Sequence, residues 1–192
     1  MNTATRGVVV GIDGGGSRTR AVLVTTDGRV LGLGTAAGSN AQDVGAVTAG
    51  RQLRTAMAAA WASAARTEAA PAAVGCGLAG LVTEADRALA HQALEHAGVL
   101  AGATPLVLES DGAAAIAGAH LGAPGLALIA GTGSACYGLG ADGRRWRAGG
   151  WGWWVGDEGS GTWIGREALI AVARERDGRG PSTALTRPLL DA

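Results

Sequence analysis

Short apolar runs separated by turn residues open the chain. The runs at 8–12, 20–25 and 30–34 have strand length and are rich in Val, Leu and Ile, so we predict three strands there. The sequence TDGR at 26–29 joins the second and third runs, and its Asp-Gly pair predicts a hairpin turn.

The spacing of apolar residues then becomes helical. Val47, Leu53, Met57 and Trp61 recur at intervals close to three or four among alanines, which predicts a helix over about 43–66. A strand is expected at 72–80, and Thr83 with Asp86 forms a predicted capping box that opens a helix to about 97. A strand at 104–110 and an Ala-rich helix at 113–120 complete a βββαβαβα order.

The same pattern then begins again. Apolar runs predict strands at 125–131, 134–140 and 144–149, followed by a helix at about 158–176. The chain is therefore expected to be an α/β protein with a first domain over 1–121 and a second, incomplete copy over 122–192. A copy without its fourth and fifth strands would expose unpaired strand edges and an apolar face. We therefore expect a fragment, or a chain that a partner completes.

Charge and composition exclude several classes of protein. The 16 basic and 16 acidic residues cancel, which does not favour binding to nucleic acid or to an acidic membrane. Lysine is absent, which excludes a Walker A loop, a protein-kinase fold and Schiff-base chemistry. The two cysteines, Cys76 and Cys136, lie far apart, which suits a reducing compartment and excludes a multi-cysteine zinc site.

No membrane-spanning or secretory segment is predicted. The uncharged stretch 112–141 is interrupted by glycines, Pro124 and the polar sequence GTGS, and the apolar run before Asp13 is too short for a signal sequence. We therefore expect a soluble, cytoplasmic protein.

Two glycine-rich turns are candidates for phosphate binding. GIDGGGSRT at 11–19 and IAGTGS at 129–134 each connect two predicted strands. Taken alone, each turn could equally be a simple hairpin turn without a binding role. Facing each other across a cleft, the two turns could offer backbone N–H groups to the phosphates of one nucleotide, and Asp13 could hold Mg²⁺ through water. A third match, GLGADG at 138–143, fits the dinucleotide pattern but precedes a strand-like segment, so we interpret it as a hairpin turn.

The motifs together resemble a known family. GIDGGGSRT (11–19), GSN (38–40), ESDGAAA (109–115), IAGTGS (129–134) and GGWGWWVGDEGSGTWIG (149–165) are similar to those of the BadF/BadG/BcrA/BcrD ATPases, in the branch of the N-acetylglucosamine and glucosamine kinases. The last motif is the most specific, and the resemblance extends over about 7–176. It implies an actin-like ATPase (ribonuclease H-like) fold that binds ATP, Mg²⁺ and a sugar, and it is compatible with a homodimer. In the family the remainder of the second domain supplies the adenosine pocket, so the resemblance also implies weak nucleotide affinity for this chain in isolation.

The resemblance also implies roles for individual residues. The positions that match the two phosphate loops are Asp13, Gly14, Gly15, Gly16, Ser17, Thr19, Gly131, Thr132 and Gly133. The positions that match sugar contacts are Asn40, Ser134, Gly150, Trp151, Gly152 and Asp157. Asp111 matches the catalytic base that accepts the proton of a sugar hydroxyl, and Asp13 matches a magnesium contact through water.

Structural roles are the alternatives for several of these residues. Asp111 could cap the helix that follows it, and Asp157 with Glu158 could be the N-cap and first-turn acid of the next helix. Asn40 could be a turn residue. Most of the clustered tryptophans are expected in the core, with one or two facing the sugar; they are Trp146, Trp151, Trp153, Trp154 and Trp163.

The function that the resemblance implies is transfer of the ATP γ-phosphoryl group to the 6-hydroxyl of an amino sugar, and the sequence leaves the choice of amino sugar open. One alternative is the ATPase activator of a radical 2-hydroxyacyl-CoA dehydratase, which needs cysteines for an iron–sulfur cluster that Cys76 and Cys136 do not suit. Another is a non-catalytic nucleotide- or sugar-binding fragment. The related repressor-and-kinase group with a structural zinc is excluded because its cysteine-rich motif is absent.

Overall fold

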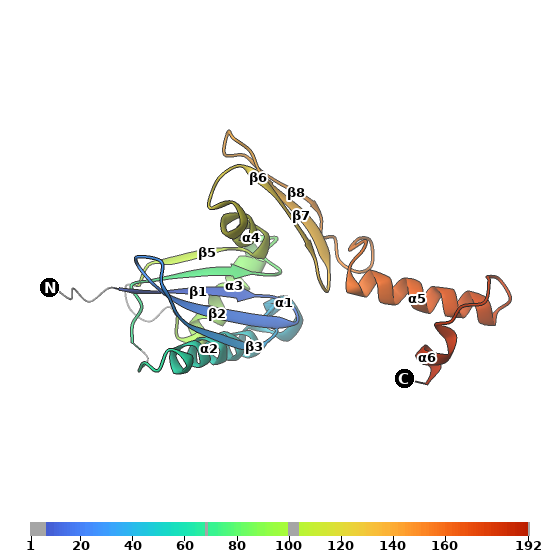
Figure 1. Ribbon diagram of the computed structural model, residues 1–192, viewed down its shortest axis with the longest axis horizontal. Coiled ribbons are helices and arrows are strands. Elements are labelled where there is room, and N and C mark those ends of the chain that lie inside the picture. The colour runs from blue at the N-terminus through green and yellow to red at the C-terminus, as the bar shows by residue number, and fades with distance from the viewer. Residues whose placement is uncertain (1–6, 68, 100–103, 192) are drawn as a thin grey trace. The chain divides into compact units, whose positions relative to one another are not determined.

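Figure 1 shows a computed structural model of the chain, which describes residues 7–67, 69–99 and 104–191. The chain divides into two compact units, Met1–Gly122 and Ala123–Ala192. Each unit is described by itself below.

The elements of unit 1 follow the predicted βββαβαβα order, except that two helices stand in place of the first one. They are β1 (Val8–Gly14), β2 (Arg18–Thr25), β3 (Val30–Ala37), α1 (Ala41–Val44), α2 (Ala46–Ser63), β4 (Ala73–Leu78), α3 (Glu84–Ala97), β5 (Leu106–Ser110) and α4 (Asp111–His120). The single helix predicted at 43–66 is instead two helices, because the backbone of Gly45 (φ 76°, ψ 158°) leaves the helical conformation between α1 and α2. The capping box at α3 is confirmed: Thr83 Oγ1 accepts from the Asp86 amide, and the Asp86 carboxylate accepts from the Thr83 amide.

Five strands form one mixed sheet in the order β3-β2-β1-β4-β5. The first three strands pair antiparallel, whereas β1–β4 and β4–β5 pair parallel. Helices α2 and α3 pack against each other and cover one face, and α4 lies over the other (Figure 1). Parallel strands joined by crossover helices bring the carboxyl ends of β1, β4 and β5 to one edge of the sheet.

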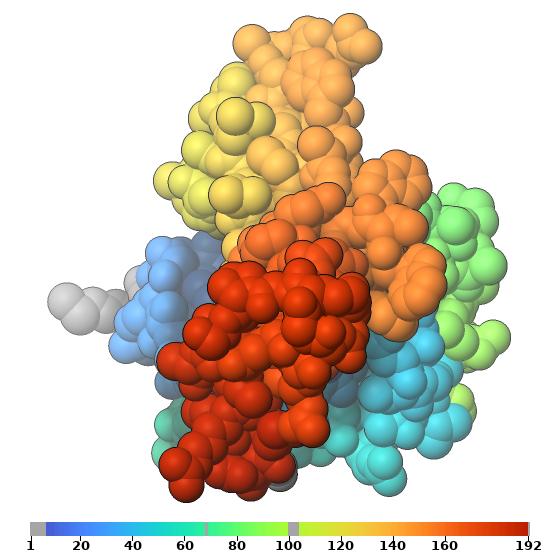
Figure 2. Space-filling model, turned by 90° about the vertical axis from the view of Figure 1, so that its right-hand side faces the viewer, coloured from blue at the N-terminus to red at the C-terminus, as the bar shows by residue number. Residues whose placement is uncertain are grey.

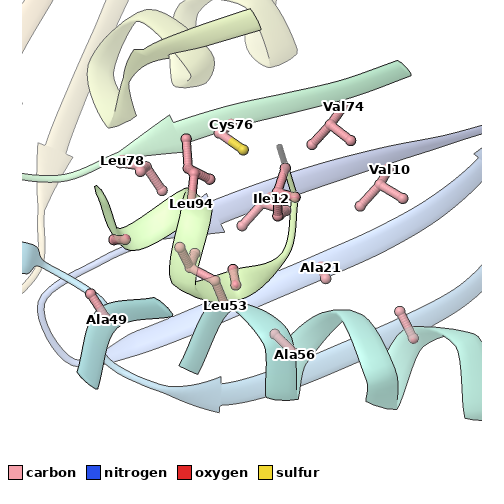
Figure 3. Close-up of a cluster of buried hydrophobic side chains, with 14 of the residues drawn as sticks. Val10, Ile12, Ala21, Ala49, Leu53, Ala56, Val74, Cys76, Leu78 and Leu94 are labelled. Carbon is pink, nitrogen blue, oxygen red and sulfur yellow. The ribbon is translucent and has the colours of Figure 1, made fainter. Parts of the chain in front are cut away.

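The core of unit 1 lies between the sheet and helices α2 and α3 (Figure 3). Alternate residues of the strands point into it, as a strand with one buried face requires. They meet small and branched side chains of the helices; the labelled members include Val10, Ile12, Leu53, Val74, Cys76, Leu78 and Leu94. Burial raises the pKa of the Cys76 thiol to about 12, so this thiol is not ionised at neutral pH.

Unit 2 begins with the second predicted βββα set. It contains β6 (Gly125–Ala130), β7 (Ser134–Leu139), β8 (Arg145–Gly149), α5 (Gly161–Arg176) and α6 (Thr186–Leu190). The strands form an antiparallel sheet in the order β6-β7-β8. The GLGADG segment is the β7–β8 turn, closed by hydrogen bonds from Gly140 N to Arg144 O and from Gly143 N to Gly140 O. Helix α5 begins at 161 because Ser160 Oγ accepts from the Trp163 amide and caps it.

The prediction that most of the clustered tryptophans lie in the core is wrong. Trp151 and Trp154 are about three quarters exposed (76% and 75%), and Trp146 and Trp153 are at least half exposed. Three of them, Trp151, Trp153 and Trp154, lie in the irregular segment between β8 and α5. Apolar side chains of β6 and α5 are also exposed, and Ala127 and Val172 are the buried hydrophobic residues among the described part of unit 2. Figure 2 shows the surface of this unit in yellow to red.

None of the helices in the described part of the chain is both long enough and apolar enough to cross a membrane.

Candidate functional site

The glycine loop of unit 1 connects β1 to β2. Gly15 N donates to Arg18 O at 2.9 Å and closes the turn, and Gly16 and Ser17 are exposed. A Cβ built on Gly16 would meet no atom nearer than the Asp43 carboxylate at 3.8 Å, so the outer side of the loop is open. A side chain at 16 would occupy the space that a phosphate oxygen needs in order to approach the main chain.

The segment Gly38–Asn40 is bound directly to this loop. Ser39 N donates to Gly15 O at 3.0 Å, and a Cβ on Gly38 would lie 1.9 Å from Gly16 O. The Thr19 hydroxyl donates to Ala37 O at 2.7 Å and shares a hydrogen bond of 2.8 Å with Ser39 Oγ. Thr19 is fully buried, so its side chain anchors the loop from behind.

Asp13 lies at the carboxyl end of β1, opposite Arg20 on β2. Its carboxylate is 3.2 Å from the Arg20 guanidinium, and both side chains are more than half exposed. Mg²⁺ is commonly held by one or two carboxylates together with phosphate oxygens and retained waters. The described residues contain no group of three or more His, Cys, Asp or Glu that could hold a metal. One exposed carboxylate beside an open glycine loop therefore fits a Mg²⁺ bound through water.

Asp111 is the first residue of α4, directly after β5. Ser110 is the N-cap of α4, because its Oγ accepts from Ala113 N at 3.2 Å. The alternative that Asp111 is this cap is therefore wrong. Asp111 is half-buried, and its Oδ1 accepts from Gly112 N at 2.8 Å.

The strand register relates Asp111 to the glycine loop. Gly14 on β1 is aligned with Leu78 on β4, and Leu78 is aligned with Ser110 on β5. Adjacent strands lie about 4.8 Å apart, so the backbone before Asp111 is about 10 Å from the start of the loop. Both lie at the same edge of the sheet, where ligands of parallel α/β folds commonly bind.

Asn40 is the N-cap of α1 rather than a simple turn residue. Its Oδ1 accepts from Gln42 N at 3.2 Å, and its Nδ2 donates to Asp43 Oδ2 at 2.7 Å. The hydrogen bond between Ser39 and the glycine loop thus places the proposed sugar contact next to the proposed phosphate contact within one unit.

The glycine loop of unit 2 is bound to the start of α5. Gly131 O accepts from Gly161 N at 2.8 Å, and Thr132 O accepts from the Thr162 hydroxyl at 2.7 Å. A Cβ on Gly131 would meet nothing within 4 Å, so this loop is also open on one side.

Two residues of unit 2 that are predicted to contact the sugar, Ser134 and Asp157, are hydrogen-bonded to each other. The carboxylate of Asp157, which is 8% exposed, accepts from Ser134 N at 3.1 Å, and Ser134 Oγ donates to Glu158 O at 2.8 Å. Asp157 is therefore not the N-cap of α5, a position that Ser160 occupies. The other predicted contacts of this unit, Gly150, Trp151 and Gly152, lie in the exposed segment after β8.

Two residues of the site, Ser39 and Arg20, were not identified from the sequence. Ser39 holds the loop through its amide and its hydroxyl, although only its neighbour Asn40 was selected from the GSN segment. Arg20 forms an exposed ion pair with Asp13, and the hairpin register that aligns positions 13 and 20 was the available signal.

Replacing Asp157 by Ala is expected to loosen the glycine loop of unit 2. The change removes the acceptor of the Ser134 amide, so hydrogen exchange at that amide should quicken about tenfold, the effect of losing about 1.4 kcal/mol. Asp157→Asn keeps a side-chain oxygen and is the matched control, with exchange close to that of the wild type. Equal exchange in all three proteins would show that this hydrogen bond does not hold the loop.

Comparisons with known proteins identify the family of the chain. The BadF/BadG/BcrA/BcrD ATPase family matches residues 10–188. An N-acetylmuramic acid/N-acetylglucosamine kinase of Clostridium acetobutylicum is 33% identical over 95% of this chain and 59% of its own length. The glucosamine kinase GspK of Vibrio cholerae is 34% identical over 92% of this chain and 58% of its own length. The chain thus spans about three fifths of these curated relatives.

A solved structure is also similar. The crystal structure of an N-acetylglucosamine kinase candidate from Chromobacterium violaceum superposes with a TM-score of 0.82 and 32% identity, covering 97% of this chain and 64% of that one. The likeness extends to both units, which confirms the actin-like fold. Because the family match includes nearly all of the described residues of both units, the chain belongs to the BadF/BadG/BcrA/BcrD ATPase family.

Proposed function

We propose that the protein transfers the γ-phosphoryl group of ATP to the 6-hydroxyl of an amino sugar, N-acetylglucosamine or glucosamine. The names of the two curated relatives support this substrate class. Residues 1–121 would form the first ATPase domain, with the first phosphate loop and the base, and residues 122–192 would belong to the second.

The single observation that carries the proposal is the register of β1, β4 and β5. It aligns the start of the glycine loop with the residue before Asp111 across three parallel strands. Phosphoryl transfer depends on positioning and on charge stabilisation, and it needs a carboxylate within reach of the attacking hydroxyl. The span of about 10 Å between the two strand ends leaves room for a terminal phosphoryl group and a sugar hydroxyl.

In the proposed reaction, Asp111 accepts the proton of the sugar 6-hydroxyl. The sugar oxygen bonds to the γ-phosphorus as the bond between that phosphorus and the oxygen of the leaving ADP breaks. Gly14–Ser17 and Gly131–Gly133 bind phosphate oxygens through backbone N–H groups. Mg²⁺, when bound, neutralises charge on the phosphates, and Asp13 would hold it through water. Asn40, Ser134, Gly150, Trp151, Gly152 and Asp157 would hold the sugar.

The alternative of a radical-dehydratase activator is not favoured. Such a protein needs cysteines that can ligate a cluster at a subunit interface. The Cys76 thiol is 3% exposed in the core of unit 1, and burial raises its pKa to about 12, so it is a poor metal ligand.

An ADP-release assay tests the proposal. With ATP and Mg²⁺, the protein is expected to release ADP in the presence of N-acetylglucosamine or glucosamine and to form the sugar 6-phosphate, identified by ³¹P NMR. A 6-deoxy amino sugar is the matched control, since it lacks the attacking oxygen and should give no product. Sugar or nucleotide binding without turnover would favour the non-catalytic alternative and would contradict the kinase.

A further inference from the structure

Helix α1 needs support from outside itself. It has four residues, none of which is buried, and a single helical turn is not stable alone. Its N-cap, Asn40, is the proposed sugar contact of unit 1. One end of the segment is fixed where Ser39 N donates to Gly15 O.

The carboxylate of Asp86 binds α1 itself, through the side chain of Gln42. Its Oδ2 accepts from the amide of Thr83 at 2.7 Å and from the amide of Val82 at 3.2 Å, which completes the cap of α3. Its Oδ1 accepts from Gln42 Nε2 at 2.6 Å. One carboxylate therefore ties α1 to the first turn of α3.

The charge of Asp86 strengthens this tie. Hydrogen bonds, first that from Gln42 and then those from Thr83, lower the pKa of the Asp86 carboxyl to about 2. The group is thus anionic at neutral pH, and hydrogen bonds to a charged acceptor are stronger than those between neutral groups.

The backbone at Gly80 lies directly against Asn40. Its φ is 80°, and a Cβ there would lie 2.3 Å from Asn40 Oδ1. Asn40, Gln42, Gly80, Leu81, Asp86 and Leu89 line one small hollow at this end of the sheet. The orientation of Asn40 is therefore limited by Gly80 on one side and by α1 on the other.

We propose that Gln42 and Asp86 are positioning residues for the sugar: their hydrogen bond fixes α1 so that the Asn40 amide keeps one orientation toward the substrate. This inference rests on the proposed function, in which Asn40 contacts the sugar. The Asn40 amide can form four hydrogen bonds, and the cap of α1 and Asp43 account for two of them, which leaves capacity for a sugar hydroxyl.

Gln42→Met tests the hydrogen bond between Gln42 and Asp86, because it keeps the length of the side chain and removes its N–H donor. Gln42 is exposed, so the core is not altered. We expect the sugar dissociation constant, measured by calorimetry, to rise about tenfold, and the ATP dissociation constant to stay within about twofold. Hydrogen exchange at the amides of Asp43, Val44 and Gly45, all bonded within α1, should quicken about tenfold.

Thr83→Ala is the matched control. It removes the Thr83 hydroxyl, which accepts from the Asp86 amide and donates to Asp86 Oδ2. Asp86 Oδ1 stays available to Gln42, so the variant should lower stability without changing sugar affinity. If Gln42→Met leaves both sugar affinity and α1 exchange unchanged, the positioning role is wrong although the kinase proposal stands. If the wild-type protein binds no amino sugar, the proposed function fails, and this inference fails with it. If the wild-type protein binds the amino sugar but does not phosphorylate it, phosphoryl transfer is excluded and the positioning role of Gln42 and Asp86 still stands.

Discussion

Replacing Asp111 by Asn is expected to lower the turnover of the amino sugar about 10²–10⁴-fold, the usual range for loss of a general base. The amide cannot accept the proton of the attacking hydroxyl. It still carries an oxygen that can accept from Gly112 N, so the start of α4 should be unchanged. The sugar dissociation constant should therefore stay within a few fold, and the two effects are separated by measuring kcat and binding in the same preparation.

The control for this variant is Asp142→Asn, the same chemical change in the exposed β7–β8 turn. It should leave kcat unaltered. Turnover by Asp111→Asn within a few fold of the wild-type rate would remove Asp111 as the base. A loss of turnover accompanied by loss of sugar binding or of thermal stability would point to a structural role instead.

Adding one methyl group at Gly38, in the segment bound to the first glycine loop, and at Gly16, in the loop itself, is expected to give opposite results. In Gly38→Ala the new Cβ would lie 1.9 Å from the backbone oxygen of Gly16, and backbone cannot turn aside as a side chain can. Overpacking of this kind costs about 1–3 kcal/mol or more, which corresponds to a fall of about 5 °C or more in the midpoint of thermal unfolding.

In Gly16→Ala the new Cβ meets only open space, apart from an ordinary contact with Asp43. Stability should change by less than about 0.5 kcal/mol, whereas ATP affinity should fall about tenfold or more because the methyl group occupies the phosphate position. Thermal denaturation measures the stability of both variants, and nucleotide titration measures their ATP affinity. Unchanged ATP affinity in Gly16→Ala would mean that phosphate does not approach this side of the loop.

Local patterns in the sequence were sufficient for most of the fold. The β1–β3 meander follows from three short apolar runs and from an Asp-Gly turn, and the cap of α3 follows from Thr83 and Asp86 three positions apart. The break at Gly45 was missed, because a glycine inside an Ala-rich helical pattern costs only about 1 kcal/mol and the apolar spacing continues past it.

Long-range features of the site were harder to predict. The alignment of Gly14 with Leu78 and of Leu78 with Ser110 could be expected in outline, since parallel strands end at one edge. The hydrogen bond of Asp157 to Ser134 spans 23 residues, and the bond of Gln42 to Asp86 spans 44, and no local pattern indicates either. The tryptophans were misplaced because burial depends on which elements cover a segment, and not on residue type alone.

The uneven distribution of tryptophan has a spectroscopic consequence. Trp61 is buried in unit 1, and the five other indoles belong to unit 2, where four of them are at least half exposed. Intrinsic fluorescence will therefore come largely from unit 2 and will already be red-shifted in the native protein. Melting of unit 1 will alter the emission of a single fluorophore, so circular dichroism is the more sensitive probe of its unfolding.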